Sequence, residues 1–389
     1  MITSFSLNGF LASGISAGIK DSKKLDLGLI FSERVASVAG VFTRNKVKAA
    51  PVIVSQAHLS MNEGKAKAII VNSGNANACT GHKGIEDAIM TTQFVANELG
   101  IDRKEVLIAS TGIIGKRLDV NIIHSSVPKL VRGLHKNGLD SVAEAIMTTD
   151  TFPKISVFEG DKYKIVGIAK GAGMIMPNMA TMLCFILTDI CIEPDPLKYI
   201  LLRVVNKTFN RITVDGDTST NDTVFIMANG ASSEDININD FNLALTKVCF
   251  DLAKMIVKDG EGASKLVDVI VKGAKNPDDA INAARAVANS NLVKTAIYGE
   301  DPNWGRIMAA LGKVDISIEP EFVDIWIDDI QIVSSGQETG SDSEVLAIQR
   351  MKKDEFSIII DLKKGPYQDH ILTCDLTHQY ITINAEYST

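Results

Sequence analysis

The stretch GMIMPNMATMLCFILTD, residues 173–189, decides which fold is expected and raises the first question about function. Its apolar run, residues 182–187, predicts a short buried strand, because such runs bounded by turn residues are typical of strands covered on both faces. A glycine, a proline and an asparagine precede the run, and a threonine, Thr181, stands at its start. The Thr181 hydroxyl group therefore lies between a segment with glycine and proline and a predicted buried strand.

A threonine hydroxyl acts as a nucleophile only when a base takes its proton, and one such base is the residue's own α-amine at a chain N-terminus. The pKa of an α-amine is near 8, which suits proton transfer close to neutrality. Thr181 would gain this amine if the bond after Ala180 broke, and the small Ala180 leaves room for the hydroxyl to attack its carbonyl. From these residues alone, the alternative that Thr181 merely opens a β-strand stays open.

Composition narrows the classes of protein that need to be considered. The 389 residues are 46% hydrophobic and 22% charged, which is typical of a globular protein, and the net charge of -7 disfavours a nucleic-acid binder. No apolar run approaches the ~20 residues of a membrane span. No basic residue precedes Lys20, so a secretory or transit signal is not expected. Five scattered cysteines without a CxxC pair predict neither a zinc site nor a disulfide framework, and they favour a cytoplasmic location.

Hydrophobic periodicity predicts an α/β protein with strands and helices alternating through the first part of the chain. We expect strands at 66–74, 105–115, 162–173 and 182–187, and helices at 84–100, 120–149, 194–210, 240–260 and 276–290. From about residue 310 the pattern is mainly of strands, at 322–333, 355–362 and 370–384. This organisation predicts a main catalytic body over 1–275 and a smaller, more β-rich lobe over 276–389.

Several common site motifs are matched only in part. The segment 111–117 lacks the glycine spacing and the Ser/Thr of a phosphate loop, and 171–176 lacks the third glycine of a dinucleotide fingerprint. The segment 214–222 begins like a calcium loop but lacks its glycine and its bidentate Glu. Six histidines are spread along the chain without pairing. The sequence therefore predicts no metal, no bound cofactor and no Ser-His-Asp triad.

Ordered blocks along the whole chain resemble those of one family, the ornithine acetyltransferases, which are the bifunctional glutamate N-acetyltransferases of arginine biosynthesis. The block KGAGMIMPNMATMLCFILTD (170–189) carries the likeness most clearly. The other blocks are NSGNANACTG (72–81), STGIIGKRL (110–118), AIMTTDTFPK (145–154), VDGDTSTND (214–222), KDGEGASK (258–265), YGEDPNWGRI (298–307) and INAEYST (383–389). A full ordered set of this kind is far more specific than any single block.

The resemblance implies a layered α/β fold of the N-terminal-nucleophile, DmpA-like type, with flanking helices and a β-rich C-terminal lobe. It implies self-cleavage between Ala180 and Thr181 into an α chain, 1–180, and a β chain, 181–389, assembled as α2β2. The Thr181 hydroxyl would take the acetyl group of N2-acetylornithine and pass it to glutamate, giving ornithine and N-acetylglutamate. No cofactor is needed for this cycle, although some members also accept acetyl-CoA as the acetyl donor.

The same resemblance assigns the other site residues. Thr111 and Gly112 match the oxyanion pair, donating from a hydroxyl and a backbone N–H respectively. Lys170 matches a substrate-binding lysine suited to a carboxylate, and Glu261 matches an acid suited to the ornithine ammonium group. Without the resemblance, these four residues would be interpreted as an ordinary turn, a surface lysine and a loop acid.

Three further residues match substrate contacts of the family, namely Thr148, Asn384 and Thr389. Chain ends usually fray, so the last two residues need an element that holds the tail in place. We expect the alternating segment 371–384 to be a strand that does so. The blocks 72–81, 214–222 and 298–307 are predicted to form tight turns around the pocket, because Asn, Asp and Gly are dense in them.

Two other functions compete with acetyl transfer. An amidohydrolase or aminopeptidase with the same threonine nucleophile would use water in place of glutamate. A non-catalytic small-molecule binding protein would keep Thr181 inside an uncut chain.

Overall fold

The computed structural model describes residues 5–176, 182–232 and 236–386 and divides the chain into two compact units. The first unit takes in residues 1–210 and 217–256, and the second takes in 211–216 and 257–387. Ala180, Thr181 and Thr389 lie outside the described residues. The assignment of a catalytic body to 1–275 and of a lobe to 276–389 stays a prediction.

The first unit contains an eight-stranded sheet with the order β4-β3-β2-β8-β7-β6-β5, and β1 pairs with β2 off this path. Its strands are β1 (Phe10–Ile15), β2 (Leu27–Phe42), β3 (Lys65–Asn72), β4 (Val106–Ser110), β5 (Lys154–Glu159), β6 (Lys164–Lys170), β7 (Leu183–Thr188) and β8 (Thr223–Ala228). The strands predicted around β3, β4, β6 and β7 are confirmed. Every residue of β7 is buried, as the apolar run predicts.

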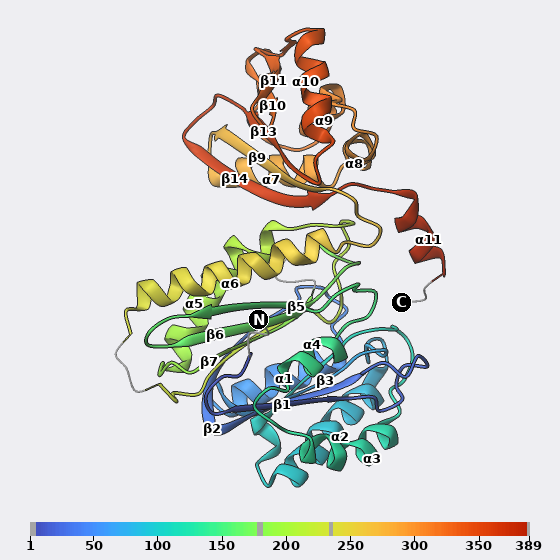
Figure 1. Cartoon of the computed structure of the whole chain (residues 1–389), viewed down its shortest axis with the longest axis vertical. Coiled ribbons are helices and arrows are strands. Elements are labelled where there is room, and N and C mark those ends of the chain that lie inside the picture. Colours follow the sequence, from blue (N-terminus) through green and yellow to red (C-terminus); the bar gives the residue numbers. More distant parts are fainter. Residues whose placement is uncertain (1–4, 177–181, 233–235, 387–389) are drawn as a thin grey trace. The chain divides into compact units, whose positions relative to one another are not determined.

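The long strand β2 belongs to both halves of this sheet. Its residues 27–37 pair with β3, its residues 37–42 pair with β8, and the register of the β3 pairing shifts between Phe31 and Ala36. Side chains of β3 and β4 share one core with side chains of β6, β7 and β8. The sheet therefore folds over on itself into two packed layers (Figure 1).

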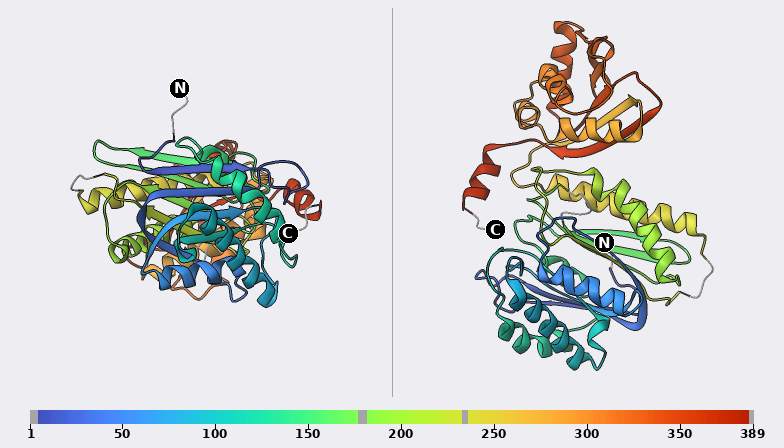
Figure 2. Two further views of the ribbon diagram at one scale, coloured as in Figure 1. Left: turned by 90° about the horizontal axis from the view of Figure 1, so that it is seen from below. Right: turned by 180° about the vertical axis from the view of Figure 1, so that it is seen from behind.

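Helices cover the outer faces of these two layers (Figure 2). On the β3–β4 side, α1 (Ala50–Met61), α2 (Gly81–Leu99) and α3 (Val120–Arg132) bury their apolar faces in a second core. On the other side lie α5 (Pro194–Lys207) and α6 (Ile238–Lys258), and Gly167 of β6 leaves room for Leu252 of α6. The short helix α4 (Leu139–Ala145) joins the core between the layers.

The single helix predicted over 120–149 is wrong, because α3 and α4 are separate helices. The backbone at Gly138, just before α4, passes so close to β1 that a Cβ atom there would lie 1.8 Å from the Ala12 carbonyl oxygen. The chain between the helices also bonds to β1, since the amide N–H groups of Ala12 and His135 each donate to the other residue's carbonyl. Tertiary contact with β1 thus replaces the helical hydrogen bonds that periodicity favours.

The second unit has a six-stranded sheet with the order β12-β11-β10-β13-β9-β14. Its strands are β9 (Leu266–Ala274), β10 (Asp324–Ile327), β11 (Ile330–Ser334), β12 (Gln337–Glu338), β13 (Glu355–Asp361) and β14 (Tyr367–Cys374), and the helices accompanying them are α7 (Pro277–Ala288), α8 (Asn291–Tyr298), α9 (Trp304–Leu311) and α10 (Ser341–Met351). The predicted helix 276–290 is confirmed as α7, and its N-cap Asn276 accepts a hydrogen bond from the Asp279 N–H at 2.8 Å. The two-sheet α/β architecture confirms the predicted fold class.

The strand predicted over 370–384 is correct only as far as Cys374, because residues 378–386 form a helix, α11 (His378–Glu386). The Asp375 carboxylate ends the strand by accepting hydrogen bonds from Ser264 and from the Lys265 N–H. The Thr377 hydroxyl then accepts the N–H of Tyr380, the third helical residue, at 3.4 Å. A capping hydroxyl therefore stabilises a helix where β-branched residues favour a strand.

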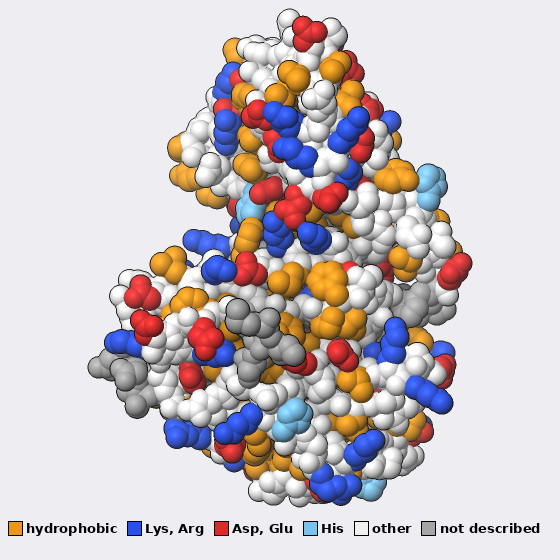
Figure 3. Space-filling model, in the orientation of Figure 1, with side chains coloured by type: hydrophobic (Ala, Val, Ile, Leu, Met, Phe, Trp, Pro, Cys, Tyr) orange, Lys and Arg blue, Asp and Glu red, His pale blue; other side chains and the backbone are white. Residues whose placement is uncertain are grey.

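Charged side chains of both signs are interspersed on the face shown in Figure 3, without a large field of one sign. Among the helices of the described residues, no segment combines the length and hydropathy that a membrane crossing requires.

Candidate active site

The turn after β4 carries the two residues predicted to form an oxyanion site, Thr111 and Gly112. The Thr111 N–H donates to the Asn72 carbonyl at 3.0 Å, which ties this turn to the end of β3. Gly112 has a φ of +126°, and a Cβ atom on it would lie 2.4 Å from the carbonyl carbon of Gly74. Only glycine fits this close approach of two backbone segments.

Both predicted oxyanion donors keep a hydrogen to give. Within the described ranges, neither the Gly112 N–H nor the Thr111 hydroxyl hydrogen has an acceptor. The Thr111 oxygen is 3.4 Å from the Lys170 ammonium nitrogen, which donates to it. The structure therefore brings three of the predicted site residues together.

A buried carboxylate, Asp150, organises the other side of this group. It accepts hydrogen bonds from the Thr148 N–H at 2.9 Å, the Gly171 N–H at 2.7 Å and the Lys154 ammonium at 2.7 Å. The side chains of Asp150 and Lys154 are both fully buried. Burial by itself raises the pKa of Asp150, but the positive charges of Lys170 and Lys154 outweigh burial and lower the pKa to about 2.

We call Thr111, Gly112, Thr148, Asp150, Lys154 and Lys170 the first cluster. Lys170 ends β6 opposite Leu183, near the start of β7, and is 8% exposed. The carbonyl of buried Met182 accepts the Thr223 N–H at 2.9 Å. Met182, the residue after Thr181, is thus held by a hydrogen bond just before β7, which pairs with the strand that carries Lys170.

Asn221 connects three of the sequence blocks that resemble the family. Its side-chain amide donates to the Ser110 carbonyl at 2.8 Å and to the Ala76 carbonyl at 2.6 Å. The Ser110 hydroxyl in turn donates to the Asn72 side chain at 2.5 Å. The blocks 72–81, 110–118 and 214–222 therefore meet beside the first cluster, and 72–81 makes the expected tight turns, with positive φ at four of its residues.

The second unit brings together another two predicted residues, Glu261 and Asn384. The Asn384 side-chain amide donates to a Glu261 carboxylate oxygen at 2.7 Å and to the Tyr380 carbonyl at 3.0 Å. Glu261 is 8% exposed, although it follows the end of α6 in a loop. Thr389, the other residue predicted at the end of the chain, lies outside the described residues.

The start of α11 is pressed against the loop that carries Glu261. Gly262 has a φ of +69°, and a Cβ atom on it would lie 2.5 Å from the Tyr380 nitrogen. The Thr377 hydroxyl donates to the Gly262 carbonyl at 2.7 Å. We call Glu261, Gly262, Thr377, Tyr380 and Asn384 the second cluster; it holds the tail with a helix rather than with the predicted strand.

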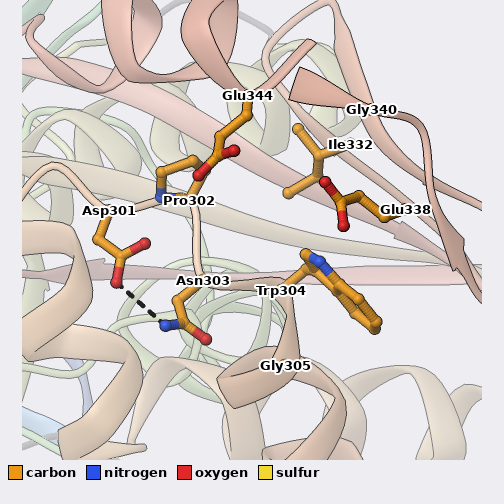
Figure 4. Close-up of a pocket in the computed structure, with 9 residues that line it drawn as sticks. All are labelled: Asp301, Pro302, Asn303, Trp304, Gly305, Ile332, Glu338, Gly340 and Glu344. Carbon is orange, nitrogen blue, oxygen red and sulfur yellow. Dashed lines mark hydrogen bonds between the residues drawn. The ribbon is translucent and has the colours of Figure 1, made fainter. Parts of the chain in front are cut away.

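The block 298–307 lines a separate cavity of about 320 Å³ in the second unit (Figure 4). Asn303 donates to the Asp301 carboxylate at 3.0 Å and accepts the Arg306 N–H at 3.2 Å, so it caps α9. Trp304, Glu338 and Glu344 also line the cavity. Glu261 and Asn384 do not line it, and the role that the structure shows for this block is the capping of α9 by Asn303.

Residue-by-residue reasoning missed Asp150 and Asn221. Asp150 lies four residues before Lys154 inside the block 145–154. The presence of an acid and a base in one family block was the signal that could have indicated this ion pair. Asn221 lies in the block 214–222, for which the sequence indicated turns but no partner.

In the described part of the chain, no group of three or more His, Cys, Asp or Glu side chains could hold a metal ion.

Comparison with known proteins adds to this geometry. The model of the ArgJ family matches residues 11–389. The arginine biosynthesis bifunctional protein ArgJ of Geobacter sulfurreducens is 48% identical over 393 residues, which cover 98% of this chain and 100% of the relative. The glutamate N-acetyltransferase of Methanocaldococcus jannaschii is 49% identical over 398 residues, covering 98% and 97%.

A solved structure, the ArgJ protein of Bacillus halodurans, is 42% identical and covers 52% of this chain and 98% of its own, with a TM-score of 0.49. The full-length sequence matches confirm the resemblance that the ordered blocks indicate, and the chain belongs to the ArgJ family.

Proposed function

We propose that this protein transfers the acetyl group of N2-acetylornithine to glutamate and so produces ornithine and N-acetylglutamate in arginine biosynthesis. The observation that carries the proposal is the match at 48–49% identity, over 98% of the chain, to relatives named for arginine biosynthesis and glutamate N-acetylation. The protein is an acyltransferase, and its cycle conserves the acetyl group without a bound cofactor. Acetyl-CoA is an additional acetyl donor to be tested.

The nucleophile is Thr181, released by self-cleavage after Ala180 into chains 1–180 and 181–389. Its new α-amine takes the proton of its hydroxyl, and the hydroxyl oxygen attacks the acetyl carbonyl of N2-acetylornithine. Ornithine leaves with the proton. The glutamate amine then attacks the acetyl-threonine ester, the bond from the acetyl carbon to the threonine oxygen breaks, and a proton from the amine returns to that oxygen as N-acetylglutamate leaves. Support comes from the family match over residues 11–389, which includes the segment around Thr181.

Thr111 and Gly112 stabilise the negative oxygen of each tetrahedral intermediate. The support is that both groups have a hydrogen to donate and that the turn is held by β3. Such a donor is typically worth about 3–4 kcal/mol in the transition state. The nearby Lys170 ammonium adds a positive charge to the same place.

The remaining residues bind the substrates. Lys170 pairs with the α-carboxylate, Thr148 contributes a hydrogen bond, and Glu261 pairs with the ornithine ammonium group. Asn384 and Thr389 complete the binding residues at the end of the chain. The hydrogen bond from Asn384 to Glu261 supports this assignment, because it orients the carboxylate. We further propose an α2β2 assembly of the cleaved chains and a cytoplasmic location.

The substitution Thr181→Ala tests the proposal. Wild-type protein should run as two fragments, the second beginning Thr-Met-Leu-Cys, and should form N-acetylglutamate from N2-acetylornithine and glutamate. Thr181→Ala should remain one uncut, inactive chain, whereas Thr181→Ser keeps a hydroxyl and should still cleave. Intact-mass measurement, N-terminal sequencing and product analysis give the answer.

Three outcomes would contradict the proposal. Cleavage or acetyl transfer by Thr181→Ala would rule out the nucleophile. Release of free acetate at the rate of ornithine formation, with glutamate present, would select the amidohydrolase. An intact, inactive wild-type chain would favour a binding protein.

A further inference from the structure

Lys20 lies beside the first cluster in a loop whose shape is fixed by one carboxylate. Asp26 accepts four backbone N–H groups, those of residues 17–20, at 2.6 to 3.1 Å. This loop joins β1 to β2, so it is anchored at both ends by the sheet. These bonds fix the position of the Lys20 backbone independently of the contacts that its side chain makes.

The Lys20 side chain reaches the segment that carries Thr148. Its ammonium nitrogen donates to the Met147 carbonyl at 2.7 Å and to the Leu25 carbonyl at 3.0 Å. Met147 immediately precedes Thr148, whose own N–H donates to Asp150. An ammonium group has three N–H donors, and within the described ranges no acceptor takes the third.

The same side chain also lies against the loop that contacts the oxyanion turn. A Cβ atom on Gly74 would lie 3.0 Å from the Cγ atom of Lys20, and a Cβ atom on Gly112 would lie 2.4 Å from the Gly74 carbonyl carbon. Lys20 therefore contacts Gly74, which packs against Gly112, and it also contacts Met147, which precedes Thr148. None of the family-matched blocks contains it.

The charges around Lys20 leave a positive surplus. Three lysines, Lys20, Lys170 and the exposed Lys24, interact here with two carboxylates, Asp26 and Asp150. Burial lowers the pKa of Lys20 to about 8, Asp26 opposes this shift, and the charges of Lys170 and Lys24 add to it. An anion placed here would relieve the repulsion between lysines.

We propose that Lys20 is a second cationic substrate-binding residue, whose ammonium group shares the α-carboxylate of the amino-acid substrate with Lys170. The inference rests on the proposed function, because N2-acetylornithine and glutamate both carry that carboxylate. A carboxylate has lone pairs for both ammonium groups. The two carbonyls that hold the Lys20 nitrogen orient its remaining hydrogen.

Kinetics of Lys20→Met and Lys20→Arg on N2-acetylornithine test this assignment, with Lys24→Met as the matched exposed control. Lys20→Met should lower kcat/KM about 10- to 100-fold, mainly through KM, as is typical of losing a hydrogen bond to a charged group. Lys24→Met should stay within about twofold of wild type. Lys20→Arg should retain activity and extend it to higher pH, because arginine keeps its charge where Lys20 loses its proton above about pH 8.

A substrate analogue separates charge recognition from a purely structural role. The α-carboxamide of N2-acetylornithine lacks the negative charge, so wild type and Lys20→Met should use it equally poorly. If Lys20→Met reduced turnover of the acid and of the amide by the same factor, or if it matched wild type on the acid, the assignment would be overturned. Failure of wild type itself to transfer acetyl would instead contradict the proposed function.

Discussion

The first cluster is built from sheet ends and buried charges, whereas the second depends on a short helix near the chain end. Asp150 and Lys154 are fully buried and paired, and Lys170 and Thr111 extend from strands of the folded-over sheet. The helix α11, which carries Asn384, contains no buried residue among those described. Its position relies on the contacts of Thr377, Tyr380 and Asn384 with the loop at Glu261 and Gly262.

This difference teaches that the two clusters should respond differently to substitution. In the first cluster, each charged side chain is buried and has a partner inside the unit. Removing one partner therefore leaves a buried charge without compensation, which destabilises the fold. In the second cluster, α11 contains no buried residue among those described, so water can replace a hydrogen bond that the side chains of this helix lose. Large effects on folding should therefore arise in the first cluster and local effects in the second.

The largest effect is expected for Asp150→Ala. It removes the carboxylate that three donors share, and it leaves the buried Lys154 ammonium without that ion pair, which typically costs about 3–5 kcal/mol. The control is Lys247→Ala, which breaks the Lys247–Asp251 pair at the same four-residue spacing but on the surface, where the cost is about 0–1 kcal/mol. Denaturant unfolding followed by circular dichroism, which reports on the secondary structure of both units, would measure both variants, and equal losses would contradict the comparison.

A smaller free-energy effect, seen in catalysis, is expected for Gly112→Ala. Its Cβ atom would lie 2.4 Å from Gly74, so the turn must shift and the predicted oxyanion donor moves with it. We expect kcat to fall about 10²- to 10³-fold, as for loss of one oxyanion donor. Gly115→Ala is the control, because Gly115 also has positive φ (+83°) but has nothing within 4 Å of its Cβ position. Similar losses in both variants would attribute the effect to backbone strain alone.

The smallest effect is expected for Thr377→Ala in the second cluster. The variant loses the hydroxyl that accepts the Tyr380 N–H and donates to the Gly262 carbonyl, and loss of such a cap costs about 1 kcal/mol. Amide hydrogen exchange in residues 378–386 should become faster, while exchange in β6 and β7 stays unchanged. Thr377→Ser keeps the hydroxyl and should exchange like wild type. Faster exchange across both units would show that α11 is not a local element.

Much of the fold could be predicted from local sequence, and two of the errors have a common cause. The run 182–187 and the Asn276 cap carry their structural signal in adjacent residues, so β7 and α7 follow directly. The break between α3 and α4 arises from contact with Ala12, more than a hundred residues away in the chain. Likewise, α11 begins where Thr377 meets Gly262, a contact that no pattern within 370–384 reveals.

The part of the candidate site that could be predicted consists of residues whose positions match single residues in the family blocks. Thr111, Gly112 and Lys170 do lie together, and so do Glu261 and Asn384. Asp150, Asn221 and Lys20 were not predicted, because their importance lies in what they contact. A buried acid, a bridging amide and a lysine tied to Met147 look ordinary in a sequence.

The sequence by itself determined the family, the α/β class and the identity of the residues proposed to react, because these depend on residue types in a fixed order. Only the tertiary structure decided how those residues are supported. The folding of one sheet through β2 brings the ends of β3, β4 and β6 to one place, and a single buried carboxylate there balances lysines from different parts of the chain. Such electrostatic balance depends on distance and burial, and neither quantity is written in the order of the residues.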